Sequence, residues 1–129
     1  QALWAFDDDL AHADLATLHQ LRIAGKWLRY TLEFVREAVE PEATPLILEV
    51  VALQDHLGSQ HDLHVAATLA RAFVSDGGSL ASHEVRSTER FVRCLDESVG
   101  RYRRSFAPVW QSLVAPAYRR RLGRALARL

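Results

Sequence analysis

A long apolar repeat constrains the fold more than any other feature of this 129-residue chain. Between residues 85 and 113, apolar or weakly polar residues recur at alternating steps of three and four: Val85, Thr88, Val92, Leu95, Val99, Tyr102, Phe106, Val109 and Leu113. Such steps place side chains on one face of an α-helix, and at this length they are typical of a helical bundle. Pro108 lies inside the repeat and has no backbone N–H to donate, so we expect a long helix with a kink.

Capping and breaker residues predict further helices. Residues 14–39 form one expected helix, which ends before Pro41. Thr44 as the N-cap and Pro45 as the first helical residue begin a second helix, which we expect to end at Gly58.

A tight corner is expected directly after that second helix. Ser59 and Asp62 match the Ser-x-x-acid capping pattern, so a third helix is predicted to begin there. It is expected to end at the Asp-Gly-Gly run of residues 76–78.

These signals together predict a single all-α domain. We expect an antiparallel helical bundle over residues 14–115, preceded by an arm or short helix over 1–13 and followed by a basic helix over 116–129. No apolar run is long enough to span a membrane. The single cysteine, Cys94, excludes an internal disulfide and fits a reducing compartment, so a cytoplasmic location is expected.

Charge is distributed unevenly although the formal net charge is zero. Residues 1–65 hold 11 acids and 4 bases, whereas residues 66–129 hold 5 acids and 12 bases. The overall balance argues against a nucleic-acid binder. Lys26 is the only lysine among the 16 Lys and Arg residues. Arginine is the better bidentate partner for phosphate and carboxylate oxygens.

Basic side chains recur along the first predicted helix. At about 100° per residue, four of them fall within roughly 80° of one another: His19, Arg22, Lys26 and Arg29. Apolar residues are expected on the opposite side (Leu21, Leu28, Val35 and Val39), with Ile23, Trp27, Phe34 and Ala38 beside them. Like charges four residues apart weaken a helix slightly, so an anionic ligand is indicated. The alternative is a solvated face neutralised by acids such as Glu33, Asp55 or Asp62.

Two linked motifs carry a resemblance to a known family. The run His19-x-x-Arg22-x-x-x-Lys26-x-x-Arg29-Tyr30-x-x-Glu33, followed by Leu53-Gln54-Asp55-x-Leu57-Gly58-x-x-His61-Asp62, resembles a repeat of the CHAD domain. The resemblance implies an all-helical fold of two bundles related by a pseudo-two-fold axis, with basic residues lining a central channel. It also implies non-catalytic binding of inorganic polyphosphate and association with polyphosphate granules. His19, Arg22, Lys26 and Arg29 are then the phosphate-facing set.

The chain holds a single copy of that motif, so it resembles one half of the domain, the C-terminal one. Either an N-terminal half or a second copy of the chain would complete the channel. His61, Arg103 and Arg104 are further candidates for contact with polyphosphate. For the C-terminal arginines, a solvated face and a surface for another polyanion or a membrane are the alternatives.

Histidines suggest a different function. His56, His61, Asp62 and His64 offer transition-metal donors, so the alternative function is a histidine-rich metal-binding or protein-interaction domain. Their spacing matches no known metal motif, and Asp62 is more simply a helix cap, so no metal site is predicted. The consecutive acids of residues 7–9 would be scattered by a helix, and Cys94 has no His or Asp partner in a catalytic pattern. Neither an enzyme nor a cofactor is expected.

Overall fold

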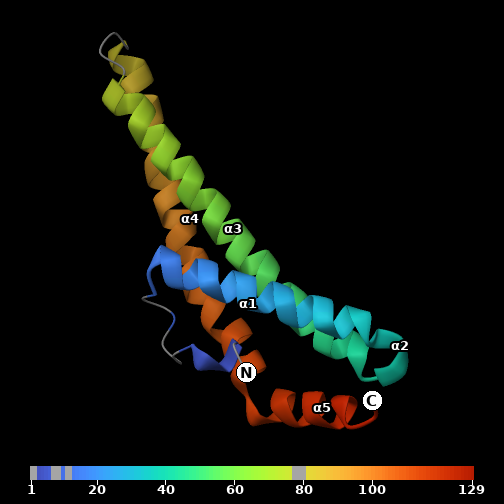
Figure 1. Ribbon diagram of the computed structural model, residues 1–129. Helices are drawn as coiled ribbons and strands as arrows, with labels where there is room; N and C mark the ends of the chain where they lie inside the picture. The colour runs from blue at the N-terminus through green and yellow to red at the C-terminus, as the bar shows by residue number, and fades with distance from the viewer. Residues whose placement is uncertain (1–2, 7–9, 11–12, 77–80) are drawn as a thin grey trace. The chain divides into compact units, whose positions relative to one another are not determined.

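The computed structural model describes residues 3–6, 10, 13–76 and 81–129 of the chain (Figure 1). Its elements are a 3-10 helix and five α-helices: η1 (Leu3–Ala5), α1 (Leu15–Phe34), α2 (Arg36–Val39), α3 (Ala43–Asp76), α4 (Ser82–Val114) and α5 (Pro116–Leu126). The described ranges contain no strand. The predicted all-α helical bundle is confirmed. The acidic run of residues 7–9 lies outside the described residues.

The first predicted helix is divided into two. Asp14 is the N-cap of α1, and its carboxylate accepts a hydrogen bond from the Thr17 amide at 2.7 Å, which lowers the pKa of Asp14. α1 ends at Phe34, Val35 forms a turn, and α2 continues to Val39. The expected stop before Pro41 is confirmed.

The predicted corner at Gly58 is wrong, because α3 runs without a break from Ala43 to Asp76. Among the described glycines none has a positive φ, so Gly58 is an ordinary helical residue. A buried face continues on both sides of it, with Leu57 3% and Gln60 4% exposed. Packing of that face outweighs the roughly 1 kcal/mol that glycine costs inside a helix. The end at Asp76 is as predicted.

The start of α3 also differs from the prediction. Thr44 is a helical residue and not the N-cap, since α3 begins at Ala43. The Thr44 hydroxyl donates to the Glu40 carboxylate at 2.7 Å and accepts from Arg36 at 3.0 Å. Pro45 is tolerated because a first-turn N–H has no partner within the helix.

The long predicted helix is confirmed as α4, with Pro108 inside it. Of its repeat, Phe106 and Leu113 are buried, and the others are half-buried. Trp110 is also buried, at 2% exposure. The kink at Pro108 stays a prediction.

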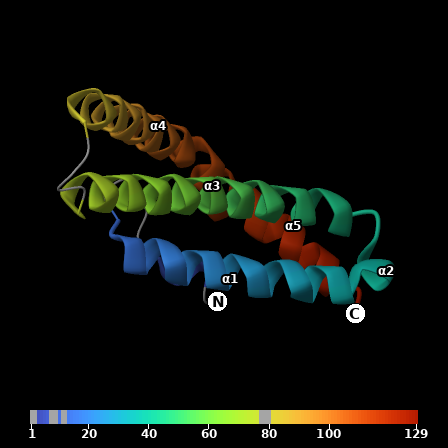
Figure 2. The ribbon, with the colours of Figure 1, turned by 90° about the horizontal axis from the view of Figure 1, so that it is seen from above.

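Contacts divide the helices into two compact units, and α3 and α4 contribute to both. The first unit comprises residues 1–57 and 105–129, and the second comprises residues 58–104. In the first unit α1 lies beside the beginning of α3 in both views (Figures 1 and 2). Its core residues include Leu21, Leu32, Val39, Leu46, Val50, Leu53, Phe106, Trp110, Leu113 and Tyr118.

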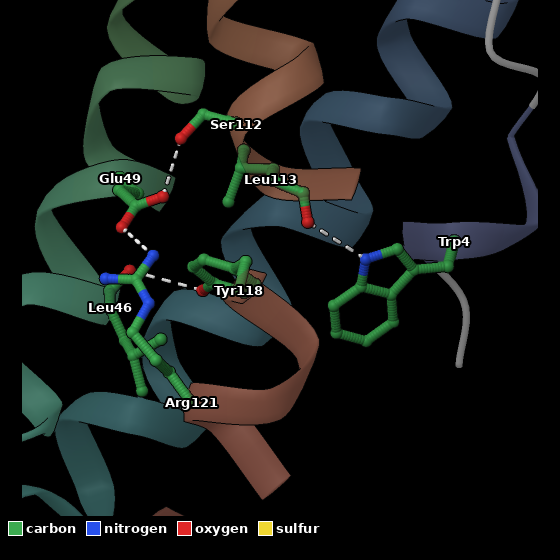
Figure 3. Close-up of polar contacts among 7 residues, drawn as sticks. All are labelled: Trp4, Leu46, Glu49, Ser112, Leu113, Tyr118 and Arg121. Atoms are coloured by element: carbon green, nitrogen blue, oxygen red, sulfur yellow. Dashed lines mark hydrogen bonds and ion pairs between the residues drawn. The ribbon is translucent and has the colours of Figure 1, made fainter. Parts of the chain in front are cut away.

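Polar contacts fasten α5 and the N-terminal segment to the core of the first unit (Figure 3). The Tyr118 hydroxyl donates to the Leu46 carbonyl at 3.2 Å, and the Trp4 indole donates to the Leu113 carbonyl at 3.1 Å. Glu49 accepts from Ser112 at 2.8 Å and pairs with Arg121. Burial raises the pKa of Tyr118, since it penalises the phenolate.

The second unit consists of the later part of α3 and the earlier part of α4. Arg71 pairs with Asp96 across it, and Ala67 is 1% exposed. Apolar side chains also remain exposed there, among them Leu69 at 65% and Phe73 at 57%. Within the described residues, none of the helices is both long and apolar enough to span a membrane.

Candidate functional site

The four basic residues His19, Arg22, Lys26 and Arg29, here called the cationic stripe, lie together on the outer side of α1. His19, Arg22 and Lys26 are exposed, and Arg29 is half-buried. Their direction is set by the adjoining face of the helix, which buries Leu18, Leu21, Gly25 and Leu32 and borders the stripe at Arg29. Burial of that face is the main stabilising contribution and leaves the basic face toward solvent.

α3 packs against α1 next to the cationic stripe. A Cβ built on Gly25 would lie 3.5 Å from Leu53 Cδ2 and 3.8 Å from Gln54 Cγ, so the two helices approach each other here. From the same place on α3, Gln54 Oε1 accepts a hydrogen bond from Arg29 Nη1 at 3.2 Å. The predicted Leu53–Gln54 motif therefore has a local role, which is to back the cationic stripe.

Arg29 is the one member of the stripe that is already paired among the described residues. Its Nε donates to Glu33 Oε1 at 2.7 Å, and the Glu33 carboxylate raises the pKa of Arg29. Together with the bond to Gln54, this contact fixes the direction of the guanidinium. The expectation that Glu33 orients Arg29 is consistent with this geometry.

The other three members have no acidic partner among the described residues. In the part of the chain that the structure describes, His19, Arg22 and Lys26 form no ion pair and no side-chain hydrogen bond. Lys26 Nζ lies 5.5 Å from the centroid of the Tyr30 ring, a cation–π contact that leaves its N–H donors available. Asp55 and Asp62 likewise pair with no base among these residues. Within the described residues, neutralisation of the cationic stripe by an ion pair is therefore restricted to Arg29.

The remaining predicted contacts belong to the second unit. His61 is exposed in the interior of α3, and the expectation that it lies in the first turn of a helix is wrong. Asp62, one residue further, is for the same reason no N-cap. Arg103 and Arg104 are exposed on α4. The structure thus groups the four α1 residues on one helix face of the first unit, whereas the other three candidates belong to the second unit.

The histidine-rich segment gives no metal site. Among the described residues, no group of three or more His, Cys, Asp or Glu side chains could hold a metal ion. His56 instead packs against Phe106, with ring centroids 5.8 Å apart, and its Nε2 lies 3.5 Å from Ser105 Oγ.

A second surface feature of α1 differs from the prediction. Ile23, Trp27 and Phe34 were expected beside the core, but Trp27 is 69% and Phe34 91% exposed. With Tyr30 they form an exposed stripe of three aromatic residues and one aliphatic residue, here called the aromatic stripe (Ile23, Trp27, Tyr30 and Phe34). At about 100° per residue these four lie roughly 20° to 80° from His19, on the side away from Arg29. The same helical spacing would have revealed them if the centre of the buried face had been placed correctly.

Comparison with known proteins gives one match. A family model described as the CHAD domain matches residues 1–71, the part of the chain that contains α1 and most of α3. No curated protein and no solved structure matches the chain.

Proposed function

The chain belongs to the CHAD domain family, and on this premise we propose that it binds inorganic polyphosphate along the cationic stripe without catalysing a reaction. The family is associated with binding of polyphosphate and triphosphate in general. The observation that carries the proposal is a set of three exposed basic groups of α1 that pair with no described residue: His19, Arg22 and Lys26.

The geometry suits a flexible polyanion. His19 and Arg29 are ten residues apart, which corresponds to roughly 15 Å along a helix and allows contact with several phosphate units. Arg22 presents a guanidinium fork to phosphate oxygens, and Lys26 acts as a point charge. Affinity then comes from several weak cation contacts and from release of the counterions of the polymer, by the reasoning that applies to nucleic-acid backbones.

Calorimetric titration with long-chain polyphosphate tests this function. Duplex DNA at equal phosphate concentration serves as the reference polyanion, both in about 150 mM salt, which suppresses diffuse attraction. The informative variant is Arg22→Glu/Lys26→Glu. The matched control is Arg86→Glu/Arg90→Glu, because these arginines are also exposed, four residues apart on a helix, and unpaired among the described residues.

We expect wild type to prefer polyphosphate and the α1 variant to lose at least about tenfold in affinity, an effect of roughly 1.4 kcal/mol. The control variant is expected to lose much less, although its change in net charge is identical. Equal losses in the two variants, or equal affinity of the wild type for DNA, would contradict the proposal.

The exposure of the aromatic stripe is an argument that a partner protein covers this surface. Exposed Trp27 and Phe34 side chains are typical of surfaces that another protein covers. The proposed occupant is a second CHAD half packed on α1, either an N-terminal half or, with this chain alone, a second copy. Two cationic faces would then flank one polyphosphate chain, and the polymer would offset their mutual repulsion.

Light scattering after size exclusion, with and without polyphosphate, tests this pairing. Trp27→Ser/Phe34→Ser is expected to abolish a dimer that forms with wild type. Leu69→Ser/Phe73→Ser is the control, since these residues are similarly exposed but lie in the second unit. A monomeric mass for wild type under both conditions would contradict a homodimer.

His61, Arg103 and Arg104 are proposed as additional contacts for a longer polymer. Arg103→Glu/Arg104→Glu should then weaken binding of long polyphosphate but not of tripolyphosphate, and equal effects would contradict the assignment. For the cellular setting, the proposal is a cytoplasmic protein associated with polyphosphate granules. Co-localisation of the tagged chain with stained granules, lost in the Arg22→Glu/Lys26→Glu variant, would support it.

A further inference from the structure

A cavity at the corner between α4 and α5 is unexplained by polyphosphate binding. It has a volume of about 610 Å³ and is lined by the end of α4 and the beginning of α5: Trp110, Gln111, Val114, Ala115, Pro116, Arg119 and Arg120. All seven residues belong to the first unit, and none comes from α1. The lining contains two arginines and no acid, so its charge favours an anion.

Arg119 and Arg120 differ in the contacts that their side chains make with the rest of the protein. The guanidinium carbon of Arg119 lies 5.3 Å from the centroid of the Trp4 ring, which positions this side chain. Arg120 is exposed and makes no ion pair or hydrogen bond with any described residue. Both guanidinium groups therefore keep donors for a ligand, one on a positioned side chain and one on a free one.

Trp110 provides an independent observation at the same cavity. This residue is 2% exposed, and its Nε1 is the one buried side-chain N or O atom without a hydrogen-bond partner among the described residues. An unpaired buried donor costs about 1 to 3 kcal/mol. Phe106 stacks on the ring, with centroids 6.4 Å apart and planes 11° apart, so the indole is held in place beside the cavity that it lines.

The beginning of α5 adds to the positive potential. α5 spans Pro116–Leu126, and its N-cap, Ala115, offers no side-chain acceptor for the first amides. The N-terminal end of a helix carries partial positive charge, and both Ala115 and Pro116 line the cavity. Anionic groups are stabilised at such an end, which reinforces the effect of Arg119 and Arg120.

We propose that this cavity binds a small phosphate monoester with a flat apolar body. The phosphate lies between Arg119 and Arg120, and the apolar body lies against Val114, Pro116 and the Trp110 side chain that also line the cavity. The volume exceeds what an inorganic phosphate fills and is within the range of small-molecule pockets. The site is independent of the cationic stripe, because the two share no residue.

Nuclear magnetic resonance of the intact chain tests the proposal, since each of its three tryptophans gives a separate indole N–H signal. Phenyl phosphate is the probe, with inorganic phosphate, benzoate and phenol as comparisons in about 150 mM salt. The Trp110 signal, identified from its loss in Trp110→Phe, is expected to shift saturably with phenyl phosphate while the Trp27 signal does not move. Benzoate and inorganic phosphate should bind at least about tenfold more weakly.

Arg120→Gln provides the decisive variant, and Arg124→Gln its control. Both residues are exposed on α5, neither is paired among the described residues, and Arg124 does not line the cavity. Arg120→Gln should weaken binding of phenyl phosphate at least about tenfold, and Arg124→Gln should leave it within about twofold. Equal effects of the two substitutions, no saturable shift of the Trp110 signal, or equal affinity for inorganic phosphate and phenyl phosphate would overturn the proposal. Arg22→Glu/Lys26→Glu should bind phenyl phosphate as wild type does, so failure here and failure of the polyphosphate proposal are distinguishable.

Discussion

Arg29 Nε donates to Glu33 Oε1 over 2.7 Å, one turn further along α1. This contact places a carboxylate inside a stripe that is otherwise basic. Glu33 therefore has two opposing effects on a polyanion, since it orients Arg29 and also repels the phosphates. The balance between them can be measured.

Glu33→Gln should strengthen polyphosphate binding about two- to fivefold. The amide oxygen of glutamine can still accept from Arg29, whereas the repelling charge is removed. Titration calorimetry gives the affinity. Glu37→Gln is the control because it removes the same charge from an exposed residue of α2 that has no described partner. Weaker binding by Glu33→Gln than by the control would mean that orientation of Arg29 by a full carboxylate matters more than repulsion.

Binding should depend on pH through His19. A polyanion next to an exposed imidazole favours the protonated form, so affinity is expected to be a few-fold higher near pH 6 than near pH 8. His19→Ala should flatten this dependence, and His83→Ala, at an exposed position of α4, should not. An unchanged pH dependence in His19→Ala would remove His19 from the phosphate-facing set.

Tyr118 predicts how the chain responds to alkali. Burial raises the pKa of Tyr118 above its ordinary value, so the unfolded chain releases this proton at lower pH than the folded chain does. The stabilising contribution is complete below about pH 10 and falls as the pH rises from there toward 12. Urea unfolding across this range should show a shallower decline for Tyr118→Phe than for wild type.

The same substitution should cost about 1 kcal/mol at neutral pH, because it removes the hydrogen bond to the Leu46 carbonyl. Tyr30→Phe is the control, since Tyr30 is 47% exposed. A decline in Tyr118→Phe as steep as in wild type would show that other groups determine the alkaline response.

Gly58 gives a direct test of the continuous α3. In a helix interior, and with nothing within 4 Å of a built Cβ, Gly58→Ala should stabilise the protein by about 0.5 to 1 kcal/mol. Gly123→Ala in α5, where the space is equally open, should behave similarly. Loss of stability in Gly58→Ala alone, measured by chemical denaturation, would indicate a helix end at residue 58 and contradict the structure.

The periodic signals were reliable where many residues contributed to them. The repeat from Val85 to Leu113 predicted α4, and the basic spacing from His19 to Arg29 predicted one face of α1. Each depends on a helical period sustained over several turns. Single-residue signals were less reliable, since Gly58 and the Ser59–Asp62 pattern predicted a corner that does not exist.

That failure has a physical reason. A capping pattern reports a preference of about 1 kcal/mol for one local conformation. Burial of a single large apolar side chain contributes about 1.5 to 3 kcal/mol, so a helix face with several buried positions outweighs the local preference. Leu53 and Leu57 lie on such a face before Gly58, and Gln60 and Ala67 on one after it.

The sequence by itself determined the all-helical class, the long helix around Pro108 and the grouping of four basic residues on α1, because all three depend on periods within one segment. Only the tertiary structure decided which face of α1 is buried, and hence that Trp27 and Phe34 are exposed. It alone paired Arg29 with Gln54 and brought Trp110, Arg119 and Arg120 to the lining of one cavity. These relationships join residues of different helices, and packing between helices, rather than any local preference, sets them.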